Sequence, residues 1–125
     1  MIAPKTTLAG AVGTALIAAC ALALAPGLNA ADTLKGDPEA GKQIANDPKL
    51  GNCVACHMMP DAKSPGRIGP ALIGMRARYP DKEKLRAQIW DATVANPDSS
   101  MPPFGKHEIL TEQQFNDVLE YIWSI

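Results

Sequence analysis

Two thiols and an imidazole lie within one stretch of five residues, Cys53 to His57. The spacing C-x-x-C-H is the attachment signature of a c-type haem. In that chemistry the thiols of Cys53 and Cys56 add across the two haem vinyl groups, and His57 binds the iron through a ring nitrogen. The motif therefore predicts one covalently bound haem c, attached at Cys53 and Cys56, with His57 as an iron ligand.

Two other kinds of site also use a C-x-x-C pair. A redox dithiol usually belongs to a thioredoxin-like domain with alternating strands, and no such strand pattern occurs here. A zinc site needs a second pair of ligands, but the chain has only three cysteines and two histidines. Cys20 lies in an N-terminal segment that we expect to be removed, and His107 alone cannot complete four ligands. The sequence therefore favours haem.

The N-terminal segment is apolar and uncharged. After Lys5 no charged residue occurs before Asp32, and Pro26-Gly27 ends the apolar run ahead of small residues that offer a cleavage site. This pattern is typical of a secretory signal peptide over residues 1–30, which would leave one domain over residues 31–125.

Two alternatives remain for this segment. The apolar run approaches the length that spans a membrane, so it could be kept as an anchor. Ile17-Ala18-Ala19-Cys20 resembles a lipoprotein processing box, and cleavage there would leave a lipidated Cys20.

Export to the bacterial periplasm agrees with haem attachment, which takes place outside the cytoplasm. After signal cleavage we expect no stable membrane insertion.

Charge and size narrow the class of protein. The formal net charge is -1, and loss of Lys5 with the signal peptide makes it -2, which argues against a nucleic-acid partner. The remaining domain is small, and its aromatic residues are only two Trp, two Tyr and two Phe. A buried haem would supply the missing apolar bulk, so we expect the haem-free chain to fold poorly.

Three segments have helical patterns, and together they predict an all-α domain. The first is Leu34 to Asn46, with Asp37 as N-cap and a face of small residues expected to cross the last helix. The second is Asp81 to Asn96. The third, Thr111 to Ile125, has a capping box and an apolar stripe that we expect against the first helix and the haem: Phe115, Val118, Leu119, Ile122 and Trp123.

The long segment from Met58 to Tyr79 is rich in Pro and Gly and is expected to wrap the haem edge. A ligand histidine normally donates its second ring N–H to an acceptor nearby. Pro70 offers a carbonyl and has no N–H of its own, so we predict that it accepts from His57. The alternative is that Gly69-Pro70 only makes a turn.

Some side chains keep two interpretations. Trp90 could pack on the haem edge or within the core without touching haem. Three arginines, Arg67, Arg76 and Arg78, could pair with the haem propionates or simply be solvated.

The second axial ligand separates electron transfer from gas or substrate chemistry. Met58 and Met59 follow His57 too closely to reach the opposite face of the haem. Met75 lies in a segment expected to cover the propionates, and His107 would give a bis-histidine site. Met101 lies far along the chain, before two prolines that stiffen its loop. We therefore predict His57 and Met101 as the iron ligands.

From about Asp37 to Ile125 the chain resembles the class I cytochromes c, in its C-V-A-C-H, G-P-A-L and M-P-P-F in that order. More narrowly, it is similar to the SoxX family, the monohaem subunits of the sulfur-oxidising SoxAX cytochromes. The stretches that carry this similarity are G-N-C-V-A-C-H, P-G-R-I-G-P-A-L-I-G-M, R-A-R-Y-P-D, I-W-D-A-T-V-A-N-P and M-P-P-F-G-K-H-E-I-L-T. The resemblance implies helices packed around a covalently bound haem with long haem-wrapping loops.

The resemblance also implies a periplasmic complex with a SoxA-type cytochrome subunit. That complex oxidatively joins thiosulfate to a cysteine of a SoxYZ-type carrier protein, a reaction of the L-cysteine S-thiosulfotransferase type. In the family the sulfur chemistry belongs to the SoxA haem site. The present chain would therefore hold no catalytic residue, and its haem site would pass electrons to a downstream acceptor cytochrome.

Two rival functions remain open on the sequence. One is a free-standing periplasmic monohaem cytochrome c that carries electrons between other proteins. The other is a haem sensor with an open iron position, which carbon monoxide binding to the reduced protein would reveal.

Overall fold

The computed structural model describes residues 35–60 and 62–125. The predicted signal peptide, Cys20 and Leu34 lie outside these residues. Within them the helical elements are, in chain order, α2 (Pro38–Asn46), η1 (Cys53–Ala55), α3 (Met75–Arg78), α4 (Lys82–Trp90), η2 (Ala92–Val94) and α5 (Glu112–Ser124). The described residues contain no strand, so the predicted all-α class is confirmed. None of the described helices is long and apolar enough to cross a membrane.

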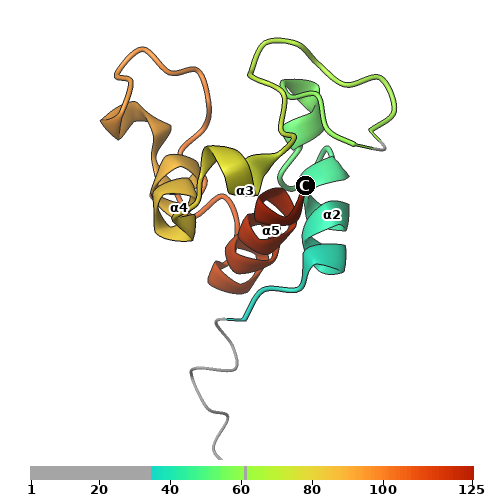
Figure 1. Ribbon diagram of the computed structural model, residues 1–125. Coiled ribbons are helices and arrows are strands. Elements are labelled where there is room, and N and C mark those ends of the chain that lie inside the picture. The colour runs from blue at the N-terminus through green and yellow to red at the C-terminus, as the bar shows by residue number, and fades with distance from the viewer. Residues whose placement is uncertain (1–34, 61) are drawn as a thin grey trace, which may run out of the picture.

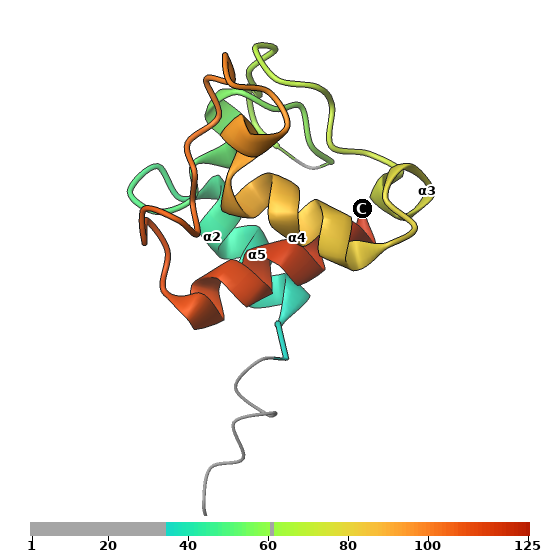
Figure 2. The ribbon, with the colours of Figure 1, turned by 90° about the vertical axis from the view of Figure 1, so that its left-hand side faces the viewer.

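Helices α2 and α5 cross at close range and form the base of the domain (Figures 1 and 2). A Cβ atom built on Gly41 would overlap the backbone carbonyl of Asp117, so only glycine allows this approach. The Asp37 N–H also donates to Asp117 Oδ1 at 2.8 Å, which ties the start of α2 to the middle of α5. The predicted crossing of the first and last helices is confirmed.

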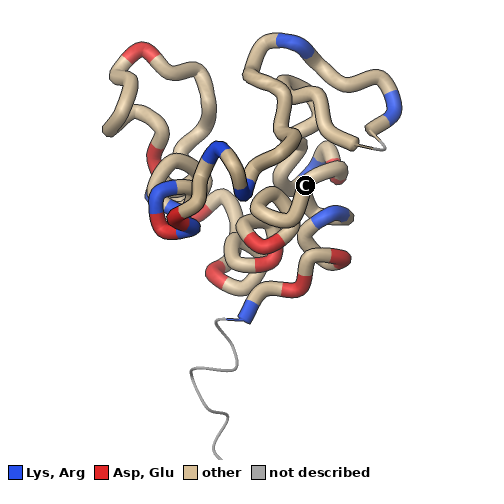
Figure 3. Tube along the Cα trace, in the orientation of Figure 1, with Lys and Arg blue, Asp and Glu red and all other residues tan. Residues whose placement is uncertain are grey.

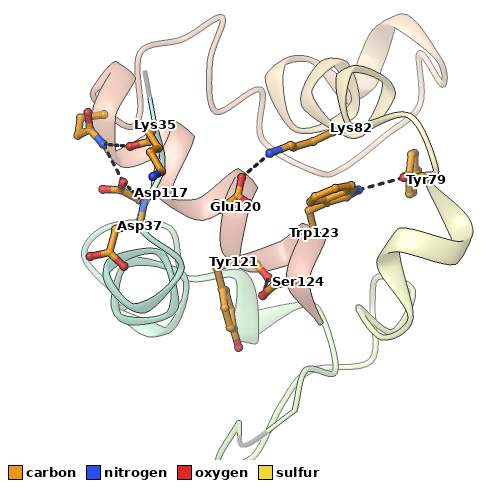
Figure 4. Close-up of polar contacts among 10 residues, drawn as sticks. Lys35, Asp37, Tyr79, Lys82, Asp117, Glu120, Tyr121, Trp123 and Ser124 are labelled. Atoms are coloured by element: carbon orange, nitrogen blue, oxygen red, sulfur yellow. Dashed lines mark hydrogen bonds and ion pairs between the residues drawn. The ribbon is translucent and has the colours of Figure 1, made fainter. Parts of the chain in front are cut away.

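Helix α5 has the predicted capping box, in which Thr111 and Gln114 each bond the other's backbone N–H. Of the predicted stripe, four side chains are buried and Trp123 is partly buried. Polar groups along α5 join it to its neighbours (Figure 4). Lys82 pairs with Glu120, and the Trp123 indole N–H donates to the Tyr79 carbonyl at 3.1 Å.

Two predicted helices are shorter in the structure, and in both an aspartate sets the limit. The first begins at Pro38, because Asp37 is extended and its carboxylate accepts from the Glu39 N–H. The second ends at Trp90, because Asp91 is extended at φ −153° and its carboxylate accepts from the Thr93 N–H. The prediction of one continuous helix to residue 96 is therefore wrong.

The segment from residue 58 to 79 is less irregular than expected, because it contains α3. Its first N–H, on Met75, donates to the carbonyl of Ile125 at 2.7 Å. This bond attaches the short helix to the C-terminal residue of the chain, and it places Met75 in the core at 1% exposure.

Two loops rise from the helical base, one between η1 and α3 and one between α4 and α5 (Figure 1). Figure 3 shows that Lys and Arg gather over α3, α4 and the first loop, and that Asp and Glu gather over α5 and the start of α2. The second loop carries few charges between residues 95 and 105, where Asp98 stands alone. The two loops and the helical base together bound the candidate site.

Candidate functional site

One cavity of about 660 Å³ opens between the two loops. Its volume lies within the range of roughly 300–1,000 Å³ that is common for ligand and cofactor sites. Residues from every part of the fold except α2 and η2 line it, among them Cys53, Cys56, His57, Pro70, Met75, Leu85, Ile89, Met101, Phe104, Val118 and Ile122. Most of this lining is apolar.

The thiol motif is fixed to the end of α2 by backbone hydrogen bonds. The Gly51 N–H donates to the Ile44 carbonyl at 3.1 Å, and the Asn52 N–H donates to the Asp47 carbonyl at 3.0 Å. Asn52 has a φ of 46°, a left-handed conformation that Asn adopts more readily than most residues. This turn starts the single-turn helix η1 and brings Cys53, Cys56 and His57 to one wall of the cavity.

The Cys53 thiol lies in an apolar setting that disfavours its ionised form. Burial raises the pKa of Cys53 to about 11, with smaller opposing and reinforcing effects from its backbone hydrogen bond and from Cys56. Redox dithiols need a lowered thiol pKa, because the thiolate is the reactive form. The environment of Cys53 therefore argues against the dithiol interpretation.

The zinc interpretation also lacks ligands in the described part of the chain. No group of three or more His, Cys, Asp or Glu side chains gathers there in a way that could hold a metal ion. His107 is exposed and does not line the cavity.

The His57 ring lies against the segment that carries Pro70. Its Nδ1 is 2.7 Å from the Pro70 carbonyl oxygen. A carbonyl can only accept, so Nδ1 carries the proton and Nε2 keeps a free lone pair for a metal. Gly69 is required here for space, because a Cβ atom on it would lie 2.6 Å from Nδ1. The predicted bond between His57 and Pro70 is present, and the close approach of Gly69 to the ring was not predicted.

The five candidate second ligands lie in different places. Met101 and Met75 line the cavity. Met59 is buried outside the lining, and Met58 is 41% exposed. The Met75 sulfur accepts a hydrogen bond from an Arg78 guanidinium nitrogen at 3.4 Å. The same Arg78 nitrogen also donates to the Ala71 carbonyl.

The positions of Trp90 and the three arginines bear on whether these side chains could contact a haem. Trp90 does not line the cavity, and its ring packs against Phe115 and Gly105 instead. Of the three arginines, only Arg78 lines the cavity. The Arg76 guanidinium lies over the Trp123 ring at 4.5 Å from its centroid.

Several polar side chains that line the cavity were not predicted from the sequence. Gln88 shares the cavity face of α4 with Leu85 and Ile89, and the i, i+3, i+4 spacing could have indicated it. Asn52, Asn96, Asp98, Ser99 and Ser100 also line the cavity. Their spacing carries no such signal, because they belong to turns and loops.

The residues present fit a haem. The cavity is large and mainly apolar, two thiols lie on one wall, and His57 offers a free Nε2 there. A thioether from Met101 lines the same cavity. The two thiols and the histidine are the groups that c-type haem attachment requires, and histidine with methionine is an iron-ligand pair found in cytochromes c.

Comparisons with known proteins agree with this site. A chain in the crystal structure of SoxXA from P. pantotrophus has 31% sequence identity and a TM-score of 0.64, covering 72% of the present chain and 82% of its own. This similarity confirms the predicted resemblance to a SoxX-type cytochrome. An uncharacterized lipoprotein from Aquifex aeolicus is 35% identical over 75 residues, 59% of this chain, and the chain spans only 36% of its length.

The family comparison covers most of the chain. The model of the Cytochrome c family matches residues 38–125, which include every described helix. Membership implies a covalent haem c, and Cys53, Cys56 and His57 supply its attachment motif. The predicted class I fold is confirmed by the same match, and the chain belongs to the cytochrome c family.

Proposed function

We propose that this chain is the electron-transfer subunit of a periplasmic thiosulfate-oxidising complex of the SoxAX type. It receives electrons released when thiosulfate is joined to a cysteine of a SoxYZ-type carrier protein, and it passes them to an acceptor cytochrome. The observation that carries the proposal is the similarity to the SoxXA structure over 72% of the chain. A SoxA-type cytochrome is accordingly the proposed partner.

When bound, haem c supplies a one-electron couple between ferric and ferrous iron. Cys53 and Cys56 would hold the group through two thioether bonds, and His57 would bind the iron through Nε2. Because the Pro70 carbonyl holds the Nδ1 proton, the ring of His57 keeps one tautomer and one orientation. Because most of the lining is apolar, few protein dipoles would have to reorient when the charge on the iron changes.

Met101 is the proposed second axial ligand. Met75 is the other methionine of the cavity, but its sulfur accepts from Arg78 and its backbone is bonded to the C-terminal residue. Met101 lies on a different loop from His57, so the two ligands come from separate walls of the cavity. A thioether favours ferrous iron and raises the reduction potential. With both His57 and Met101 bound, the iron would offer no position to a substrate, which favours electron transfer over catalysis at this haem.

The ligand assignment is tested by Met101→Ala in the haem-loaded protein. The wild-type ferric protein should show the weak far-red band of sulfur-to-iron charge transfer, and the variant should lose it and bind carbon monoxide when reduced. Met58→Ala is the matched control, because Met58 is 41% exposed and lies outside the lining. A far-red band that persists in Met101→Ala would contradict the assignment.

A second experiment separates a complex subunit from a free carrier. The tagged chain is purified from its native host, and the haem spectrum is then followed after addition of SoxA-type and SoxYZ-type proteins with thiosulfate. A stable heterodimer and thiosulfate-dependent haem reduction are expected. A monomer whose haem stays oxidised under these conditions would favour a free-standing carrier.

Export remains part of the proposal, with two forms of the mature N-terminus. Signal cleavage after residue 30 would release the domain into the periplasm. The name of the Aquifex relative, a lipoprotein, supports the other form, in which Cys20 is lipidated. Intact mass spectrometry of the mature protein distinguishes them, since the two forms begin at different residues.

A further inference from the structure

The loop that carries Met101 is attached to the end of α4 by three contacts. A Cβ atom on Gly105 would overlap the six-membered ring of Trp90, so the loop backbone lies directly on the indole. The next residue, Lys106, donates its backbone N–H to the Trp90 carbonyl at 3.3 Å. Its side-chain Nζ lies 2.7 Å from Asp91 Oδ2. We refer to Trp90, Asp91, Gly105 and Lys106 together as the loop clamp.

The α4 side of the loop clamp is itself held in place. The Trp90 ring meets Phe115 of α5 edge-on, with the ring centroids 5.4 Å apart, and the Arg86 guanidinium lies 5.2 Å from the Trp90 centroid. Asp91 is 5% exposed, and its carboxylate also accepts from the backbone N–H of Thr93 at 3.1 Å. The loop therefore rests on groups fixed by tertiary packing.

The position of the backbone at Gly105 constrains that of Met101, because the two residues are close in the chain. Only Pro102, Pro103 and Phe104 separate Met101 from Gly105, and the two prolines have fixed φ angles. Beyond the loop clamp, the His107 N–H donates to the Pro103 carbonyl at 3.0 Å. A displacement at Gly105 must therefore move Met101 as well, because few backbone rotations lie between them.

We propose that the loop clamp positions the Met101 thioether in the haem cavity. None of its four residues lines the cavity, so they are positioning residues that act only through the loop. This inference rests on the proposed role of Met101 as an iron ligand. Without the Asp91–Lys106 pair, the Asp91 carboxylate would lose its cationic partner while staying buried, and the loop would lose one of its three attachments.

The test uses the haem-loaded full chain and two variants of the loop side. Lys106→Met removes the ion pair and keeps the aliphatic stem, and Gly105→Ala forces the loop away from Trp90. Lys106→Arg is the conservative variant that should retain function. The matched control is Lys82→Met, which removes an ion pair between α4 and α5 that does not touch the loop.

Two measurements are made on each variant. Hydrogen exchange of the amides between residues 99 and 106 reports on the attachment of the loop. It should rise about tenfold in Lys106→Met, the factor expected for losing one partly exposed charge-assisted hydrogen bond. Carbon monoxide binding to the reduced protein reports on the iron ligand. It should become faster in Lys106→Met and Gly105→Ala, and it should stay at the wild-type rate in Lys106→Arg and Lys82→Met.

The outcomes separate this inference from the ligand assignment. Unchanged exchange and unchanged carbon monoxide binding in both loop variants would overturn the loop clamp, even if Met101→Ala loses the far-red band. Equal changes in Lys82→Met would also overturn it, because they would reflect general destabilisation. If Met101→Ala keeps the far-red band, the assignment of Met101 as an iron ligand fails, whatever the loop variants show. If the loop variants exchange faster but bind carbon monoxide at the wild-type rate, the loop clamp holds the loop without positioning Met101, and the proposal is overturned.

Discussion

The helical base and the two loops of this molecule are held together in different ways. In the base, α2 and α5 meet with the Gly41 backbone against the Asp117 carbonyl, and the Asp37 N–H adds a direct bond between the helices. Both loops line the cavity, and in the described residues a few backbone hydrogen bonds attach each of them to a helix or to the motif. We therefore expect the base to hold its structure without haem, and the loops to depend more on the group that fills the cavity.

Glycines also fix the position of the loops. Gly66 meets the backbone of Ala55 in η1, whereas two others meet side-chain rings. Gly69 lies against the His57 ring, and Gly105 lies against the Trp90 ring. Such contacts constrain position only while the ring itself is fixed. The ring of Trp90 is fixed by Phe115, and that of His57 by the Pro70 carbonyl and, in the loaded protein, by iron. This difference predicts which changes unfold the domain and which only alter the site.

The largest expected effect is the loss of the haem itself. In Cys53→Ser/Cys56→Ser no covalent attachment is possible, and an apolar cavity of about 660 Å³ is left without its filling. We expect thermal unfolding of this chain to be broad and shifted far down in temperature, and exchange in both loops to be fast. A sharp, cooperative transition close to that of the loaded protein would show that the loops do not need the haem.

A change in the base should come next in size. Gly41→Val would drive a branched side chain into the Asp117 carbonyl, and we expect a destabilisation of about 3 kcal/mol or more. Denaturant unfolding of the haem-loaded protein, followed by circular dichroism, measures it. Gly74→Asn is the control, because nothing lies within 4 Å of a Cβ atom there and Asn tolerates its φ of 62°. Equal stability of the two variants would contradict the close crossing.

A change in the first loop should affect the site more than the fold. Gly69→Ala would press on the His57 ring and weaken its bond to the Pro70 carbonyl. Loss of such a bond typically weakens metal binding roughly 10–100-fold, so the acid pH at which the histidine leaves the iron should rise by about one to two units. An absorption titration measures this. Ala71→Ser is a neighbouring control and should titrate like the wild type.

The smallest expected effect is the dependence of stability on acid pH through Asp91. The hydrogen bond from Lys106, followed by that from Thr93, lowers the pKa of Asp91 to about 2. The unfolded carboxyl titrates near pH 4, so this stabilisation is fully present above about pH 4 and is lost as the pH falls through about 2. Asp91→Asn should therefore be less stable than the wild type at pH 6, and the difference should shrink toward pH 2. A difference that stays constant across this range would contradict the lowered pKa.

Several features of the molecule were readable from residues close together in the chain. The C-x-x-C-H motif, the Asp37 and Asp81 caps and the Thr111–Gln114 capping box all involve partners at most four residues apart. Local backbone geometry brings such partners together in any fold that contains the turn or helix. The haem-attachment motif and the caps at Asp37 and Asp81 were therefore predictable from the sequence, and so was the apolar face of α5.

The tertiary structure decided the features that join distant segments. It ended α4 at Asp91, because Lys106 and Thr93 hold that carboxylate. It placed Trp90 against Gly105 and away from the cavity. It also brought the Gly69 backbone so close to the His57 ring that no side chain fits at residue 69. Sequence spacing cannot give the contacts with Gly69, Gly105 and Lys106, because partners 12 or more residues apart meet only through the packing of the whole chain. The amino-acid sequence thus determined the chemistry of the motif, and the packed fold determined which side chains surround it.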